Sequence, residues 1–244
     1  MEEFFVLYRG WLILLVVIVA LALAITIVLK YAFRYSLTEE DRKIILPGDD
    51  YIDGAREPRF DAGGFAITID APAELVWQHI RQFGQDRAGW YSFERLERLC
   101  TFKIHNHYTI HPEWQDIYPG RFLFYHQPPW GLGSLITEVD ESNFMFASVS
   151  DSRKKPEVTG SIHFRPPLGI KYFCWTWNFG AVDLGNGTTR YISKAQLSFE
   201  PYTKLRIAVV VVVLGIPSLI MGSHHMNLLK RICEGKKTID SKHI

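Results

Sequence analysis

The sequence predicts one α+β domain behind an N-terminal transmembrane helix, and three features lead to this prediction. Apolar residues without a charge fill positions 11–29, alternating strand patterns fill most of 104–199, and helical spacing of apolar residues follows Pro217. Strands grouped together and helices segregated from them are typical of the α+β class. We therefore expect a curved antiparallel sheet that closes around a long C-terminal helix.

The composition excludes several classes of protein. The chain has 244 residues and a formal net charge of +1, so it lacks the basic field that nucleic-acid binding requires. Its three cysteines are far apart and form no CxxC pair, which argues against a disulfide framework and a zinc knuckle. Phosphate loops, dinucleotide fingerprints and a Ser-His-Asp order are also missing from the sequence, so no cofactor is expected.

Residues 1–35 are predicted to form the membrane anchor. At 1.5 Å per residue, the apolar segment 11–29 is about 28 Å long as a helix, close to the hydrocarbon thickness of a bilayer. Side chains suited to headgroups flank it: Tyr8, Trp11, Lys30, Tyr31 and Arg34. A cleaved signal peptide is the alternative, but the apolar run is longer than such peptides usually carry.

The charges around this segment predict its orientation. Four cations follow it and only Arg9 precedes it; those that follow are Lys30, Arg34, Arg42 and Lys43. Because cytoplasmic flanks carry the excess of Lys and Arg, we expect a single-pass protein with its soluble domain in the cytoplasm.

A second apolar segment lies at 205–221, before the final helix. Its uninterrupted core is only about ten residues long, which suits a segment that lies in the interface or dips into the membrane better than a second span. Both alternatives remain open. The helix that follows Pro217 is predicted to end at Gly235, and 236–244 forms a tail.

The elements of the domain follow in order. Residues 36–60 are rich in charge, Gly and Pro and form a juxtamembrane linker or strap. Residues 64–70 alternate as a strand, a helix runs from Pro72 to Gly84, and a short helix covers 93–99. The remaining strands are predicted at 121–125, 135–139, 143–148, 160–164, 172–181 and 188–199, with a hairpin turn at 185–187 between the last two.

Several motifs resemble the SRPBCC superfamily, the START and Bet v 1-like helix-grip proteins, and within it an uncharacterised membrane-anchored subgroup labelled polyketide cyclase/dehydrase-like. The motifs are 46–49, 69–72 with 76–77, 82–92, Asn106 with 110–115, 187–190 and 226–230. The resemblance covers residues 46–235, with the START-like domain at 61–235, and it implies a sheet wrapped around the C-terminal helix with an apolar cavity between them. A fold shared by carriers, cyclases and regulators does not choose among these functions.

Aromatic and polar side chains within these motifs are the candidate ligand-binding residues. They are Arg87, Trp90, Tyr91, Phe124, Trp130, Phe146, Trp175 and Trp177. Arg87 suits a carboxylate or phosphate group, and Tyr91 suits a carbonyl. The alternatives are that the aromatic rings simply fill the core, and that Asp86 and Arg87 form a structural pair within their loop.

The histidines near residue 110 are candidate acid–base groups. Their spacing with Glu113 matches no zinc signature, so no metal site is predicted. If the protein is an enzyme of the cyclase or dehydratase kind, the candidate catalytic residues are Arg87, Tyr91, His107 and His111.

The function that these features favour is a membrane-anchored protein that holds a lipid or another small apolar ligand in a helix-grip cavity. The expected partners are the lipid bilayer and the apolar ligand; no protein partner can be named. A cyclase/dehydratase-like enzyme acting on a hydrophobic substrate and a regulatory subunit at the membrane are the alternatives, so the sequence does not decide whether the protein is an enzyme.

Overall fold

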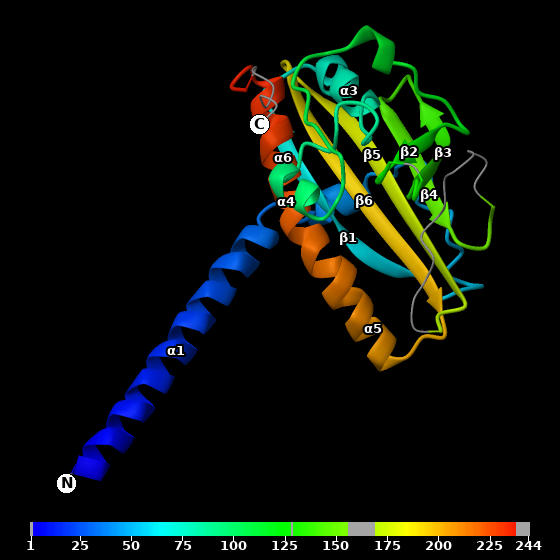
Figure 1. Cartoon of the computed structure of the whole chain (residues 1–244). Helices are drawn as coiled ribbons and strands as arrows, with labels where there is room; N and C mark the ends of the chain where they lie inside the picture. Colours follow the sequence, from blue (N-terminus) through cyan, green and yellow to red (C-terminus); the bar gives the residue numbers. More distant parts are fainter. Residues whose placement is uncertain (1, 128, 156–168, 238–244) are drawn as a thin grey trace.

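The computed structural model describes residues 2–127, 129–155 and 169–237, with side chains from Tyr8 onward. Six antiparallel strands form one sheet in the order β1-β6-β5-β4-β3-β2. Figure 1 shows the last helix lying along one face of this curved sheet, while the N-terminal helix points away from the domain. The predicted α+β class, the antiparallel sheet with its long C-terminal helix, and the apolar N-terminal helix are confirmed.

The strands are β1 Phe60–Ile69, β2 Phe122–Phe124, β3 Gly133–Asp140, β4 Met145–Asp151, β5 Tyr172–Gly185 and β6 Thr188–Glu200. The helices are α1 Glu2–Ala32, α2 Glu39–Lys43, α3 Ala73–Arg81, α4 Glu94–Leu99, the 3-10 turn Pro112–Trp114, α5 Lys204–Val210 and α6 Ile216–Cys233. The strand predicted at 160–164 lies outside the described residues. The predicted hairpin is confirmed: Asn186 and Gly187 have φ values of 55° and 73°, as a two-residue turn of type I′ requires.

The main core lies between the inner face of the sheet and the helices α3 and α6. Its largest fully buried side chains include Trp77, Phe83, Tyr91, Phe146 and Phe179. From α6, Met226 and Leu229 pack into the same cluster. Alternation along β5 sends Trp177 and Phe179 to this inner face, which explains the apolar pattern of the sequence there.

The outer face of the sheet is covered by residues 36–59, which we call the strap. Leu46 packs against Ala66 and Ile192, and Ile52 packs in a second outer cluster. Gly48 has a φ of +74°, and a Cβ there would lie 2.7 Å from the Cβ of Ala147, so only glycine permits this approach. The segment predicted as a linker or strap is therefore packed on the domain as a strap.

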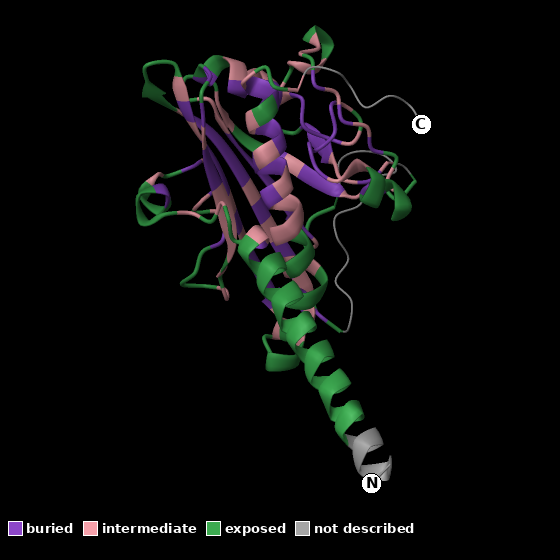
Figure 2. Cartoon of the chain, turned by 90° about the vertical axis from the view of Figure 1, so that its left-hand side faces the viewer, coloured by how far each residue is buried: buried purple, intermediate pink, exposed green. Residues whose placement is uncertain are grey.

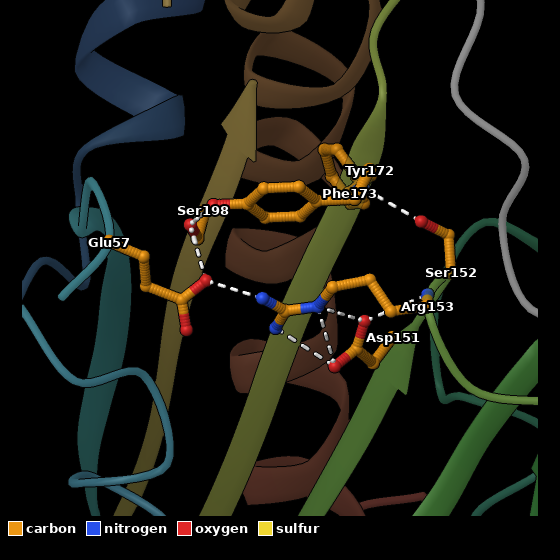
Figure 3. A network of polar contacts seen from close by, with 7 residues as sticks. All are labelled: Glu57, Asp151, Ser152, Arg153, Tyr172, Phe173 and Ser198. Atoms are coloured by element: carbon orange, nitrogen blue, oxygen red, sulfur yellow. Dashed lines mark hydrogen bonds and ion pairs between the residues drawn. The ribbon is translucent and has the colours of Figure 1, made fainter. Parts of the chain in front are cut away.

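A polar network fixes the end of the strap (Figure 3). The Arg153 guanidinium donates to Glu57 of the strap and to Asp151 at the end of β4, at 2.8 and 2.9 Å. Glu57 also accepts a hydrogen bond from Ser198 of β6, whose hydroxyl lies 2.9 Å from that of Tyr172 in β5. One strap carboxylate is thus tied to three strands.

A buried ion pair fixes the other end of the strap and makes stability depend on pH. Two Arg190 nitrogens donate to the Asp41 carboxylate at 2.8 and 2.6 Å, and these bonds lower the Asp41 pKa to about 2. Arg190→Gln is expected to lower the free energy of unfolding by about 3 kcal/mol at neutral pH, because it leaves a buried carboxylate unpaired. Since a carboxylate with a lowered pKa stabilises the fold only when ionised, this loss shrinks as the pH falls from about 4 to about 2.

Denaturant unfolding across this pH range measures the effect. Arg56→Gln is the control, because Arg56 pairs with Asp53 while its side chain is 87% exposed; it is expected to change stability by less than about 0.5 kcal/mol. Equal losses for the two variants would contradict the role given to the Asp41–Arg190 pair.

Among the residues that the structure describes, two helices are long and apolar enough to cross a membrane: residues Tyr8–Ala32 of α1, and Lys204–Cys233. The second is continuous, because α5 passes through a π-helical turn, Val211–Gly215, into α6. This joins the predicted apolar segment to the final helix. The wider turn ends two residues before Pro217, which lacks the backbone N–H of a regular α-helix.

The second helix has two different faces at its N-terminal end. Ile207, Val210 and Leu214 pack on the lower part of the sheet. Its exposed apolar residues are Leu205, Val211, Val212, Val213 and Ile216. Figure 2 colours this stretch and the length of α1 as exposed, and Figure 1 shows α5 and α1 diverging from each other. The two helices meet where the Ser223 hydroxyl donates to the carbonyl oxygen of Ala32 at 2.8 Å.

Candidate functional site

Six aromatic residues meet on the inner face of the sheet, and we call them the inner aromatic cluster: Phe83, Trp90, Tyr125, Phe146, Trp177 and Phe179. The indoles of Trp90 and Trp177 are stacked, with centroids 4.9 Å apart and an angle of 14°. Tyr125 meets both indoles edge-on at 5.3 and 5.9 Å. Phe179 lies 4.9 Å from the rings of both Phe146 and Trp177. The cluster joins β4, β5 and the residue after β2 to the loop after α3.

Serine hydroxyls lie among these rings. The Trp177 indole N–H donates to Ser193 at 2.7 Å, and the Ser148 hydroxyl donates to the Trp177 carbonyl at 2.8 Å. The Tyr125 hydroxyl bonds to Ser134, and burial raises the pKa of Tyr125, so its hydroxyl stays neutral. Trp177 and Tyr125 are only partly buried. Aromatic surface with a few fixed polar groups is the composition of sites for small apolar ligands.

Tyr91 is held rigidly beside this cluster. Its φ is +50°, an unfavourable value for an aromatic residue, and its backbone N–H donates to Asn106 Oδ1 at 2.9 Å. Its hydroxyl accepts from Gln82 Nε2 at 2.8 Å and lies 3.1 Å from His79 Nδ1. Burial lowers the His79 pKa to about 4, so this imidazole is neutral near pH 7. The sequence places His79 on the buried side of its helix but gives no sign of its contact with Tyr91.

A second buried histidine joins α6 to the cluster. His225 Nδ1 donates to the Trp90 carbonyl at 2.6 Å, so the Tyr191 hydroxyl donates to Nε2 at 2.8 Å. His225 also packs edge-on against Phe83. Sequence reasoning missed this residue, because only the observed rotation of α6 distinguishes His225 from its neighbour His224.

The predicted polar pair has a different partner in the structure. Arg87 Nη2 lies 2.7 Å from Asp116 Oδ1, and Arg87 Nη1 donates to the carbonyls of Trp114 and Asp116 at 2.5 and 3.0 Å. The structural pair is therefore Arg87 with Asp116, not with Asp86. The alternative considered from the sequence paired Arg87 with its neighbour Asp86, whereas the fold brings Asp116 from a later loop to Arg87.

The remaining aromatic candidates are spread over the domain. Trp175 shares the inner face with Trp177 but packs near α5, in the second cluster that contains Val210. Phe124 is partly buried and meets Phe122 edge-on at 4.9 Å. Trp130 is 64% exposed. It lies in the turn after β2, where strand alternation no longer directs side chains inward, and the structure thus places it outside the interior.

The candidate histidines gather in one surface-facing group. His107 and His111 have ring centroids 5.5 Å apart, and His111 stacks on Trp114 at 4.1 Å. His111 Nδ1 lies 3.2 Å from Glu113 Oε1. Within the part of the chain that the structure describes, His, Cys, Asp and Glu side chains form no group of three that could hold a metal ion.

Comparisons with known proteins give a likeness of fold. No family model matches the chain, and no curated protein matches it. Norcoclaurine synthase from Thalictrum flavum, solved with dopamine and hydroxybenzaldehyde, is 14% identical with a TM-score of 0.40, over 80% of this chain and 98% of that chain.

Two further solved structures are 11% identical to this chain. A hypothetical protein from Helicobacter pylori has a TM-score of 0.39, over 79% of this chain and 95% of that one. The Zhui aromatase/cyclase from Streptomyces sp. R1128 has a TM-score of 0.32, over 71% and 94%. These scores carry no conclusion about function, which must come from the residues of this chain.

Proposed function

We propose that the chain is a membrane-anchored protein that binds a small apolar ligand against the inner aromatic cluster. The observation that carries the proposal is the partly buried pair Trp177 and Tyr125 within an otherwise buried aromatic face. Partly buried aromatic surface of this kind suits stacking, and the adjacent hydroxyls of Ser134 and Ser193 can orient a polar group of the ligand.

The anchor supports a ligand that comes from the bilayer. The apolar window of α1 contains no buried residue, and its C-terminal end is bonded to α6 through Ser223. A helix with this surface is stable in a lipid environment. The domain is then held at the membrane surface, on the cytoplasmic side according to the cations that follow α1.

Val212 is expected to lie among lipid headgroups and upper acyl chains. The opposite face of its helix packs on the sheet, which favours a segment that dips into the interface over a second span.

We expect an environment-sensitive fluorophore on Val212→Cys, in a Cys100→Ser background in nanodiscs, to be quenched most by lipids brominated near the headgroup. The same label on Ile45→Cys, an exposed apolar residue of the strap, is the control and should not be quenched. Strongest quenching of the Val212 label from the bilayer centre would indicate a span instead.

Equilibrium binding tests the proposed function directly. Full-length protein in detergent is titrated with oleyl alcohol, and binding is followed by calorimetry. Trp177→Phe should weaken binding by roughly three- to tenfold, because it removes the indole stack and the bond to Ser193. Trp130→Phe should leave the affinity unchanged. Wild-type protein that is folded but has no affinity for the alcohol would refute the proposal.

The pair of His79 and Tyr91 favours a second candidate, a cyclase- or dehydratase-like enzyme. A neutral imidazole hydrogen-bonded to a phenol is suited to moving a proton. For any hydrophobic substrate that the protein turns over, Tyr91→Phe and His79→Gln are each expected to reduce kcat by roughly 10²–10⁴-fold. Unchanged turnover in both folded variants would exclude this pair as the acid–base group.

A further inference from the structure

Arg121 carries a buried charge beside the loop that contains Arg87. Its side chain is 6% exposed, and neither Nη1 nor Nη2 has a hydrogen-bond acceptor among the residues that the structure describes. The carboxylate oxygen Asp86 Oδ2 lies 3.9 Å from Nη2, too far for a hydrogen bond. Burial lowers the Arg121 pKa to about 10, so the group remains positive near pH 7.

The neighbouring charges are already engaged or poorly placed. Asp116 is bonded to Arg87, and the Arg87 nitrogens are used by this carboxylate and by two backbone carbonyls. Asp86 is the carboxylate near Arg121, but its side chain is 41% exposed and can turn toward solvent. Arg121 therefore presents two directed donors, which a planar group with two oxygen atoms matches in geometry.

The guanidinium of Arg121 also lies beside the loop that follows α3. A Cβ on Gly84 would be 3.9 Å from Arg121 Nη2, so the guanidinium adjoins the backbone of this residue. Gly84 directly follows Phe83, whose ring packs on Trp90, Tyr91 and Phe179. The charged donor pair thus lies beside the loop that carries Phe83, one ring of the inner aromatic cluster.

We propose that Arg121 binds a carboxylate or phosphate group through Nη1 and Nη2, and that this group is the anionic end of an amphiphile whose apolar part lies on the inner aromatic cluster. The placement of the apolar part on the inner aromatic cluster rests on the proposed function, whereas the anion site at Arg121 does not. The anion displaces Asp86 and supplies the acceptors that Arg121 lacks within the described chain. Arg87, which the sequence favours for this role, already uses Nη1 and Nη2 for Asp116 and for two backbone carbonyls.

The experiment compares four probes on the full-length protein in detergent: oleate, oleyl alcohol, acetate and inorganic phosphate. Wild-type protein should bind oleate at least about tenfold more tightly than oleyl alcohol. Arg121→Gln should remove this preference and leave alcohol binding unchanged. Arg56→Gln, at an exposed arginine, should keep the preference. Asp86→Asn should strengthen oleate binding, because it removes the competing carboxylate.

The other outcomes separate the possible sources of the anion. Binding of acetate or phosphate that requires Arg121, without a preference for oleate, would retain the anion site but overturn its assignment to an amphiphile. If oleyl alcohol does not bind while an anion binds through Arg121, the proposed function fails and the anion site stands. An oleate preference that persists in Arg121→Gln, or wild-type protein that binds no anion, overturns the inference. Should Arg121→Gln fail to fold, Arg121→Lys, which keeps the charge without the planar donor pair, should show a weakened preference.

Discussion

Replacing Trp90 by alanine is expected to lower the free energy of unfolding by about 3–5 kcal/mol. Trp90 is 7% exposed, and its ring stacks on Trp177 and contacts Tyr125 and Phe83. Its removal leaves a cavity among rigid rings that cannot collapse into the space. The backbone carbonyl that anchors His225 also loses its fixed position, so α6 should loosen from the cluster.

Trp130→Ala is the matched control for this prediction. Both tryptophans are candidate ligand-binding residues by sequence, but Trp130 is 64% exposed. Its replacement should change stability by less than about 0.5 kcal/mol. Chemical denaturation of the full-length protein in detergent, followed by fluorescence, compares the two variants. Similar losses of unfolding free energy in Trp90→Ala and Trp130→Ala would contradict the buried position of Trp90 in the inner aromatic cluster.

Gly222→Ala is expected to destabilise the protein by about 1–3 kcal/mol. In an unobstructed helix the same substitution stabilises by up to about 1 kcal/mol, because alanine has the higher helix propensity. Here the added Cβ would lie 2.2 Å from Cε2 and 2.4 Å from Cζ of Phe65, so either the ring or α6 must move. The sign of the effect thus reports how closely α6 is packed on β1.

Two further variants isolate this contact. Gly215→Ala, in the same continuous helix, places its Cβ 3.8 Å from Val211 Cγ1 and should be neutral or stabilising. Adding Phe65→Leu to Gly222→Ala should recover part of the lost stability, since the smaller side chain makes room for the methyl group. A stabilising Gly222→Ala, measured by thermal unfolding, would contradict the close packing of α6 on the sheet.

Local patterns were sufficient to predict most of the fold. The alternation of Phe65, Ile67 and Ile69 identified β1, and Asn186 with Gly187 identified the hairpin between β5 and β6, because these signals depend only on neighbouring residues. The packing of the strap was less visible. Its buried residues Leu46 and Ile52 are too widely spaced to show a period, and their burial depends on the outer face of the sheet.

The sequence predicted several residues of the candidate site but not which side chains contact one another. The sequence indicated Trp90, Tyr91 and Trp177 and the loop after α3. It could not indicate that His79 meets Tyr91, or that Arg87 uses Asp116, 29 positions later in the chain. Such contacts depend on how the loops fold over the sheet. The sequence also offered no sign of Arg121, because a buried guanidinium whose Nη1 and Nη2 lack hydrogen-bond acceptors among the described residues is visible only in the structure.

Native mass spectrometry of the gently extracted full-length protein, followed by organic extraction and identification of any bound compound, tests the central claim most directly. The account predicts a defined lipophilic compound on the wild-type protein, with much lower occupancy in Trp177→Phe and unchanged occupancy in Trp130→Phe. A folded wild-type protein that is consistently empty and does not take up oleyl alcohol would contradict it.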